Sequence, residues 1–256
     1  MPKYFCNFGV LFSSQFSIMS HHFIRFQDVR YTYPNGFEAL RGVDFTITHG
    51  EHVALLGLNG AGKSTLLLHT NGLLLPTSGE VNVGGVPVSR KTLKLVRRSV
   101  GMVFQNPDDM LFMPTVAEDV AFGPMNMGLP EEEVRSRVER ALNEVGCAHL
   151  RDRAPFQLSG GQKRMVAMAT VLAMTPDILV LDEPTSNLDM KARRELIGIL
   201  KKFHHTILLA THDLALVEEL CPRSIVIEEG RVTADTLTER IFADPALCLR
   251  LGISPN

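Results

Sequence analysis

Apolar positions in this chain fall into short runs separated by helical patterns. Alternating apolar residues from Phe23 to Tyr33 and from Val43 to Ile47 predict two strands that pair as an antiparallel edge sheet. Further strands are predicted from apolar runs at 53–56, 80–83, 100–104, 178–182, 206–210 and 224–227. Because helical patterns alternate with these later strands, we expect an α/β fold with a mostly parallel sheet and helices on both faces.

The helical patterns carry recognisable start and stop signals. Pro130 followed by three glutamates favours a helix start, an apolar stripe runs from Val134 to Val145, and Gly146 ends it. Ser159 is a suitable N-cap for a helix that continues to Met174. A further helix is predicted from Met190 to Lys202.

A glycine-rich stretch lies between the apolar runs at 53–56 and 66–68, in the order strand, loop, helix. Gly57, Gly62, Lys63 and Ser64 fit the phosphate-loop pattern, in which backbone N–H groups and a helix N-terminus converge on phosphate oxygens. Lys63 would neutralise the β- and γ-phosphates of ATP, and the Ser64 hydroxyl would be a ligand of Mg²⁺. The predicted nucleotide-binding loop comprises Gly57, Asn59, Gly60, Ala61, Gly62, Lys63, Ser64 and Thr65.

Two carboxylates, Asp182 and Glu183, end the apolar run that starts at Ile178. Ligands of open parallel sheets gather at the carboxyl ends of the strands, so we expect both side chains near the phosphate loop.

Composition narrows the class of protein. The chain has 256 residues, 45% of them hydrophobic, which suits one large domain with a substantial core. Its net charge of -2, from 26 Lys and Arg against 28 Asp and Glu, gives no electrostatic footprint for nucleic acid. Four scattered cysteines suit a reducing compartment and argue against a disulfide framework or a zinc site.

No apolar run reaches the length of a membrane-spanning helix. Residues 1–18 lack a clear signal-peptide pattern, and we expect them to be a disordered extension before a single domain over residues 19–256. Met19 lies just before the first strand pattern and is a second candidate for the start of translation.

The segment after the strand at 100–104 is rich in Met and Phe as far as Gly128. These side chains suit either ordinary core or an adaptable contact surface for another protein. Our hypothesis is that Leu111, Phe112 and Met113 line a groove that receives a helix of a partner protein.

Several motifs together resemble the nucleotide-binding subunit of ATP-binding cassette (ABC) transporters. They are the phosphate loop, Gln105, the sequence from Leu158 to Gln162, Asp182 with Glu183, the sequence from Ser186 to Asp189, and His212. The stretches 104–109 and 115–124 further resemble the ATPase of energy-coupling-factor importers, above all those for cobalt or nickel. Vitamin importers of that type, exporters or amino-acid importers of the same fold, and soluble cassette ATPases without a membrane partner are the alternatives.

The resemblance implies roles for the residues of one subunit. Asp182 would join Ser64 around Mg²⁺, and Gln105 would touch the metal or the water and sense the membrane partner. Glu183 would polarise the water that attacks the γ-phosphate. His212 would contact the γ-phosphate. Tyr33, which from its spacing is either a strand-end core residue or an aromatic near the base, would stack on adenine.

The resemblance also implies partners. Ser159, Gly160 and Gly161 would bind the γ-phosphate of ATP held by a second ATPase subunit, in a homo- or heterodimer. Gln162 and Asp189 would be further nucleotide-binding residues. A helical lobe at about residues 90–170 would rotate as ATP binds and is hydrolysed, and would drive an integral membrane scaffold whose cytoplasmic helix lies in its groove and which works with a substrate-binding membrane subunit. The chain would then lie on the cytoplasmic face of the cell membrane as a peripheral subunit. Asn187 departs from the small residue common at its position in the family.

Overall fold

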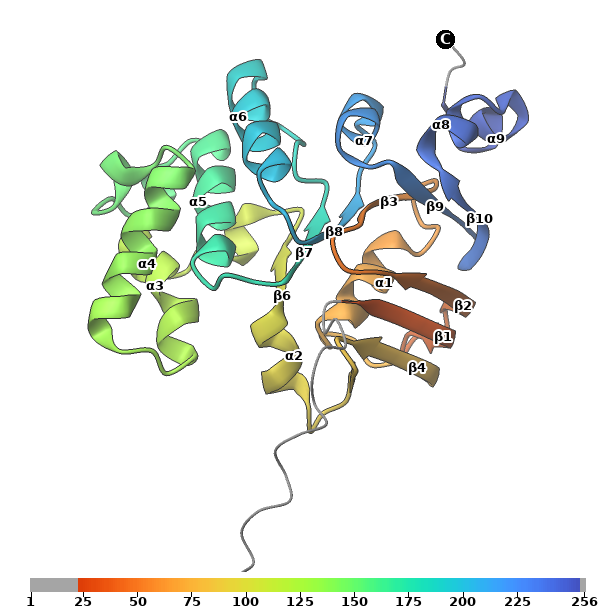
Figure 1. The fold of residues 1–256 in the computed structure, drawn as a ribbon, viewed down its shortest axis with the longest axis horizontal. Helices are drawn as coiled ribbons and strands as arrows, with labels where there is room; N and C mark the ends of the chain where they lie inside the picture. Colours follow the sequence, from red (N-terminus) through yellow and green to blue (C-terminus); the bar gives the residue numbers. More distant parts are fainter. Residues whose placement is uncertain (1–22, 254–256) are drawn as a thin grey trace, which may run out of the picture.

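Two sheets organise residues 23–253, the part of the chain that the computed structural model describes (Figure 1). The predicted extension at residues 1–18 lies outside this range. The six-stranded sheet has the order β10 (Arg231–Leu237), β9 (Arg223–Glu228), β3 (His52–Leu56), β8 (Thr206–Ala210), β7 (Ile178–Asp182), β6 (Val100–Val103). All of its neighbours are parallel except β10 and β9. The predicted mostly parallel sheet is therefore confirmed.

The second sheet is antiparallel, with the order β2 (Glu38–Ile47), β1 (Ile24–Thr32), β4 (Ser78–Val83), β5 (Val86–Pro87). Ile24 pairs with Ile47 and Phe26 with Phe45, so the alternating apolar residues of both strands share one face. The predicted pairing of the first two strands is thus confirmed.

Nine α-helices are present among the described residues: α1 (Lys63–Thr70), α2 (Leu93–Ser99), α3 (Val116–Asn126), α4 (Glu131–Glu144), α5 (Gly160–Leu172), α6 (Met190–Lys201), α7 (Leu214–Leu220), α8 (Thr238–Phe242) and α9 (Pro245–Arg250). Three short 3-10 helices accompany them, η1 (Pro107–Asp109), η2 (Ala148–Leu150) and η3 (Pro155–Gln157). The sequence patterns gave no signal for β10, α8 or α9.

The parallel strands of the six-stranded sheet, from β9 to β6, are buried on both faces, whereas the edge strand β10 is largely exposed. Ile178, Val180 and Leu208 point toward α1 and the antiparallel sheet, whereas Leu179 and Leu181 point the other way, because neighbouring residues of a strand alternate between faces. Burial on both faces explains why these strands read as continuous apolar runs.

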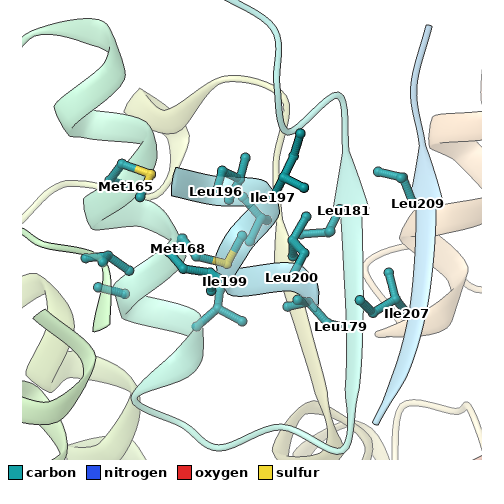
Figure 2. Close-up of a cluster of buried hydrophobic side chains, with 14 of the residues drawn as sticks. Met165, Met168, Leu179, Leu181, Leu196, Ile197, Ile199, Leu200, Ile207 and Leu209 are labelled. Atoms are coloured by element: carbon teal, nitrogen blue, oxygen red, sulfur yellow. The ribbon is translucent and has the colours of Figure 1, made fainter. Parts of the chain in front are cut away.

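Helix α6 packs in the hydrophobic core on the face of the large sheet that carries Leu179 and Leu181. Figure 2 shows its side chains, among them Leu196 and Leu200, between Met168 of α5 and the strand residues Leu181 and Leu209. Helices α5 and α6 therefore pack directly on β7 and β8.

Helices α3, α4 and α5 pack against one another at one end of the molecule, and together we call them the helical lobe (Figure 1). These helices span residues 116–172. The interval of about 90–170 that we predicted for the lobe also contains β6, but β6 is an edge strand of the large sheet. Helix α3 was not predicted, and it contains Gly123 and Pro124, two residue types that disfavour a helix interior. Its start is fixed by Thr115 and Glu118, whose side chains each accept from the other's backbone N–H in a capping box.

The hypothesis that Leu111 lines a groove for a partner is wrong. It is only 9% exposed and packs in the core between the lobe and the sheet, whereas its neighbour Phe112 is 62% exposed. The apolar side chain at 111 turns inward to fill that core, so Leu111 does not line a surface.

Candidate active site

A cleft of about 420 Å³ opens at the carboxyl ends of the strands, between the start of α1 and the hairpin that leads into β2. Asp182 of β7 pairs with Ala210 of β8, so the residues that follow both strands emerge at the same level. The cleft is lined by Phe37, Ala39, Asn59, Gly60, Gly62, Lys63, Ser64, Thr65, Gln105, Asp182, Glu183, Ser186 and His212. Residues from distant parts of the sequence meet here as predicted.

The phosphate loop has a backbone that requires glycine. Gly57, Gly60 and Gly62 all have positive φ, and a Cβ on Gly57 would lie 2.2 Å from the Ile227 carbonyl oxygen. Gly57 and Ala61 support the loop from below rather than line the cleft. Helix α1 begins at Lys63 without a side-chain cap, so its first backbone N–H groups remain available to an anion in the cleft.

The side chain of Lys63 folds back against the phosphate loop. Its Nζ donates hydrogen bonds to the carbonyl oxygens of Gly57 at 2.7 Å and Leu58 at 3.0 Å. Burial lowers the pKa of Lys63, and the charges of Glu183 and Asp182 oppose that shift. An ammonium group has three donors, so one N–H remains for a phosphate oxygen.

Asp182 is 8% exposed. Burial raises the pKa of its carboxyl, and a hydrogen bond from Ser64 and the charges of Lys63 and Arg164 act in the opposite direction. The Ser64 hydroxyl, the Asp182 carboxylate and the Gln105 amide thus offer hard oxygen donors beside the phosphate loop. This set fits Mg²⁺, which takes one or two carboxylates together with substrate phosphates and waters.

Glu183 follows Asp182 in a left-handed conformation, with φ of 48°, which is strained for this residue type. Its backbone N–H donates to the Ala210 carbonyl at 2.8 Å, and its Oε2 accepts from the Thr211 hydroxyl at 3.2 Å. The neighbouring His212 lies with Nε2 3.5 Å from Glu183 Oε1 and 2.9 Å from Asn59 Oδ1. A carboxylate and an imidazole therefore face the place where a terminal phosphate would lie.

The predicted residues 159–162 and Asp189 do not line this cleft. Ser159 and Gln162 form a capping box at the start of α5, as the N-cap prediction required, and Gly160 lines a separate cavity of about 630 Å³. Asp189 caps α6 by accepting from the backbone N–H groups of Lys191 and Ala192.

Tyr33 stands beside the cleft rather than on its wall. Its hydroxyl hydrogen-bonds with the Thr65 hydroxyl at 2.9 Å, and its ring contacts Tyr31 edge to face. The aromatic on the wall is Phe37, which is 54% exposed and which we did not single out from the sequence. Ser186 also lines the cleft; it belongs to the motif at 186–189, from which we proposed only Asp189 as a site residue.

Residues 40–186 match the family model described as "ABC transporter". GSU1281 of Geobacter sulfurreducens, provisionally named an ABC transporter ATP-binding protein, is 60% identical over 90% of this chain and 92% of its own length. The energy-coupling factor transporter ATP-binding protein EcfA of Methanothermobacter thermautotrophicus is 47% identical over 90% of this chain and 76% of its own.

Two solved structures share the fold. The protein cbiO1 from Clostridium perfringens, described as part of the ABC transporter complex cbiONQ, has a TM-score of 0.76 and 42% identity, covering 90% of this chain and 95% of its own. The ATP-binding cassette MJ0796, solved as a dimer bound to ADP and Pi in a post-hydrolysis state, has a TM-score of 0.77 and 31% identity, covering 84% of this chain and 98% of its own.

Proposed function

This chain belongs to the ABC transporter family, in which it is an ATP-binding ATPase subunit, and we propose that it powers an energy-coupling-factor importer for cobalt or nickel ions. The observation that carries the proposal is the similarity to EcfA and to cbiO1 over nine-tenths of the chain, together with the cleft described above. The relatives named for a multi-subunit transporter thus match this chain through both its lobe and its sheet.

The proposed chemistry follows from the side chains in the cleft. Lys63 and the first N–H groups of α1 bind the β- and γ-phosphates, and Tyr33 or Phe37 packs beside the base. Ser64, Asp182 and Gln105 would hold Mg²⁺, which would neutralise phosphate charge when bound. Glu183 accepts a proton from the attacking water, and His212, fixed by Asn59, orients that water toward the γ-phosphate.

A second ATPase subunit completes the proposed site. Ser159 and Gly160, at the N-terminus of α5, and Asp189 lie away from the cleft of their own chain. The N-terminus of α5 is suited to bind a γ-phosphate. It can do so only in the cleft of another subunit. The dimer of MJ0796 with ADP and Pi supports this arrangement.

The proposed contact with the membrane subunits is an exposed apolar surface on the helical lobe, made of Phe112, Phe122 and Met125, which we call the docking surface. These side chains are 62%, 43% and 64% exposed, and the rings of Phe112 and Phe122 meet edge to face at 4.9 Å. Exposed apolar clusters of this kind mark protein contacts. Among residues 23–253, no helix is both long and apolar enough to cross a bilayer, so the proposed peripheral position depends on such a contact.

Phe112→Asp tests this function. A charge placed in a desolvated contact costs about 3–5 kcal/mol, so assembly with the membrane subunits should weaken more than a hundredfold. The matched control is Leu249→Asp on α9, where the side chain is 77% exposed and far from the lobe (Figure 1).

The measurements are co-purification with the membrane subunits and uptake of radioactive cobalt or nickel by cells. We expect loss of both with Phe112→Asp and parent-like behaviour with Leu249→Asp. Uptake of a vitamin in place of either metal would refute the metal assignment. Full assembly of the Phe112→Asp subunit would refute the docking surface.

A further inference from the structure

One arginine of the helical lobe reaches into the core of the site. Arg164, on α5, is 3% exposed. Its Nη1 donates to the Phe104 carbonyl at 2.8 Å, and its Nη2 donates to the Gln105 carbonyl at 2.5 Å and to the Ser186 hydroxyl at 3.3 Å. The guanidinium therefore crosses from the lobe to loops that follow two neighbouring strands, β6 and β7.

The partners of this buried cation are carbonyls and a hydroxyl, not a carboxylate in direct contact. Burial lowers the pKa of Arg164, and the charges of Asp182 and Glu183 oppose that shift. A buried charge with such partners stabilises a fold poorly compared with an apolar side chain. Its geometry therefore points to a role other than core stability.

Both contacts of Arg164 lead to residues of the proposed chemistry. On one side it fixes the backbone of Gln105. On the other side, Ser186 Oγ donates to the Glu183 carbonyl at 2.8 Å, and Glu183 is the residue with the strained φ of 48°. A displacement of α5 would thus move the supports of Gln105 and of Glu183 together.

We propose that Arg164 is a positioning residue that makes ATP hydrolysis depend on how the helical lobe sits against the sheet. It acts through the Gln105 carbonyl and through Ser186, so it affects the hydrolysis step and leaves nucleotide binding by the phosphate loop intact. This inference rests on the roles proposed above for Gln105 and Glu183. It does not require the membrane partner or the identity of the transported ion.

The test uses the purified full chain, with steady-state ATPase assays at protein concentrations that allow dimer formation. We expect Arg164→Gln to lower kcat at least tenfold while KM for ATP stays within twofold. Arg164→Lys, which keeps the charge and one donor direction, should restore part of kcat. The matched control is Arg137→Gln, since Arg137 also donates to backbone carbonyls of the lobe, those of Ala173 and Met174, without reaching the site.

Equal losses of kcat in the Arg164→Gln and Arg137→Gln variants would overturn the proposal, as would a rise in KM at unchanged kcat. Ser186→Ala gives an independent reading if Arg164→Gln does not fold, because it removes the link to Glu183; parent-like kcat in that variant would count against the proposal. In the double variant Arg164→Gln/Ser186→Ala, kcat should equal that of Arg164→Gln within twofold. If the two losses of kcat multiply instead, Arg164 and Ser186 act independently, and the proposal is wrong. If Glu183→Gln itself hydrolyses ATP normally, the proposed role of Glu183 fails, and this outcome is distinct from a failure at Arg164.

Discussion

Replacing Lys63 by Ala removes the only lysine that lines the cleft among the described residues. A unit charge 4 Å from a phosphate charge contributes about 4 kcal/mol at an effective dielectric constant near 20. Because the cleft is open to solvent, we take about half of this as the lower bound, so the loss lies at about 2–4 kcal/mol. The dissociation constant for ATP should then rise by about 30- to 700-fold.

The assay is calorimetric titration of the purified subunit with a non-hydrolysable ATP analogue and Mg²⁺. Thermal melting of the same samples separates lost binding from lost folding, since Lys63 also holds the Gly57 and Leu58 carbonyls. Lys191→Ala is the control, because its side chain is 81% exposed on α6. A dissociation constant within threefold of the parent, in a variant that melts normally, would refute the electrostatic account of this loop.

Two further predictions concern the carboxylates. Glu183→Gln should bind ATP like the parent and lose turnover, because an amide cannot accept a proton from water; size-exclusion chromatography with ATP and Mg²⁺ should show a trapped dimer, and a monomer that hydrolyses ATP normally would contradict this. At Asp213, burial acts to raise the pKa, but hydrogen bonds from Arg193, at 2.7 Å, and from two other donors outweigh it and hold the pKa below its ordinary value. Its stabilising effect is therefore present above the unfolded pKa of about 3.9 and lost as pH falls through the folded value. Asp213→Asn should thus lower Tm at pH 7, and its difference in Tm from the parent should shrink as the pH falls below about 3.9. A Tm difference that stays constant over this range would exclude ion pairing as its source.

Local sequence patterns were sufficient to predict most of the strands and several helix starts. The apolar run before Asp182 predicts a strand buried on both faces, and Ser159 predicts an N-cap, because both signals act within a few residues. A signal of the same kind exists for α3, because Thr115 and Glu118 have the spacing of a capping box, but our sequence analysis did not use it.

Other features depend on contacts that sequence spacing does not contain. Leu111 and Phe112 are adjacent apolar residues, and only packing decides that one is core and the other surface. Phe37 reaches the cleft because the hairpin between β1 and β2 folds over the phosphate loop. Arg164 has no motif of its own, and its contacts arise only when α5 packs beside β6.

Asn187 shows how a departure from a family pattern acquires a physical reason. Its φ is 61°, in the left-handed region that Asn adopts more readily than other side-chain-bearing residues. Asn187 therefore keeps the turn between Ser186 and the α6 cap without glycine.

The order of the strands determines when a growing polypeptide can first hold nucleotide. Strand β3, which leads into the phosphate loop, lies between β8 and β9, and Gly57 packs under Ile227. Both neighbours are encoded late, so the ribosome releases β3 long before either partner exists. Until residues 206–210 emerge, this apolar strand has both edges unpaired, and one edge stays unpaired until residues 223–228 follow. An unpaired strand edge is the state in which nascent chains need protection from aggregation. The part of the molecule that binds ATP is thus synthesised early and completed late.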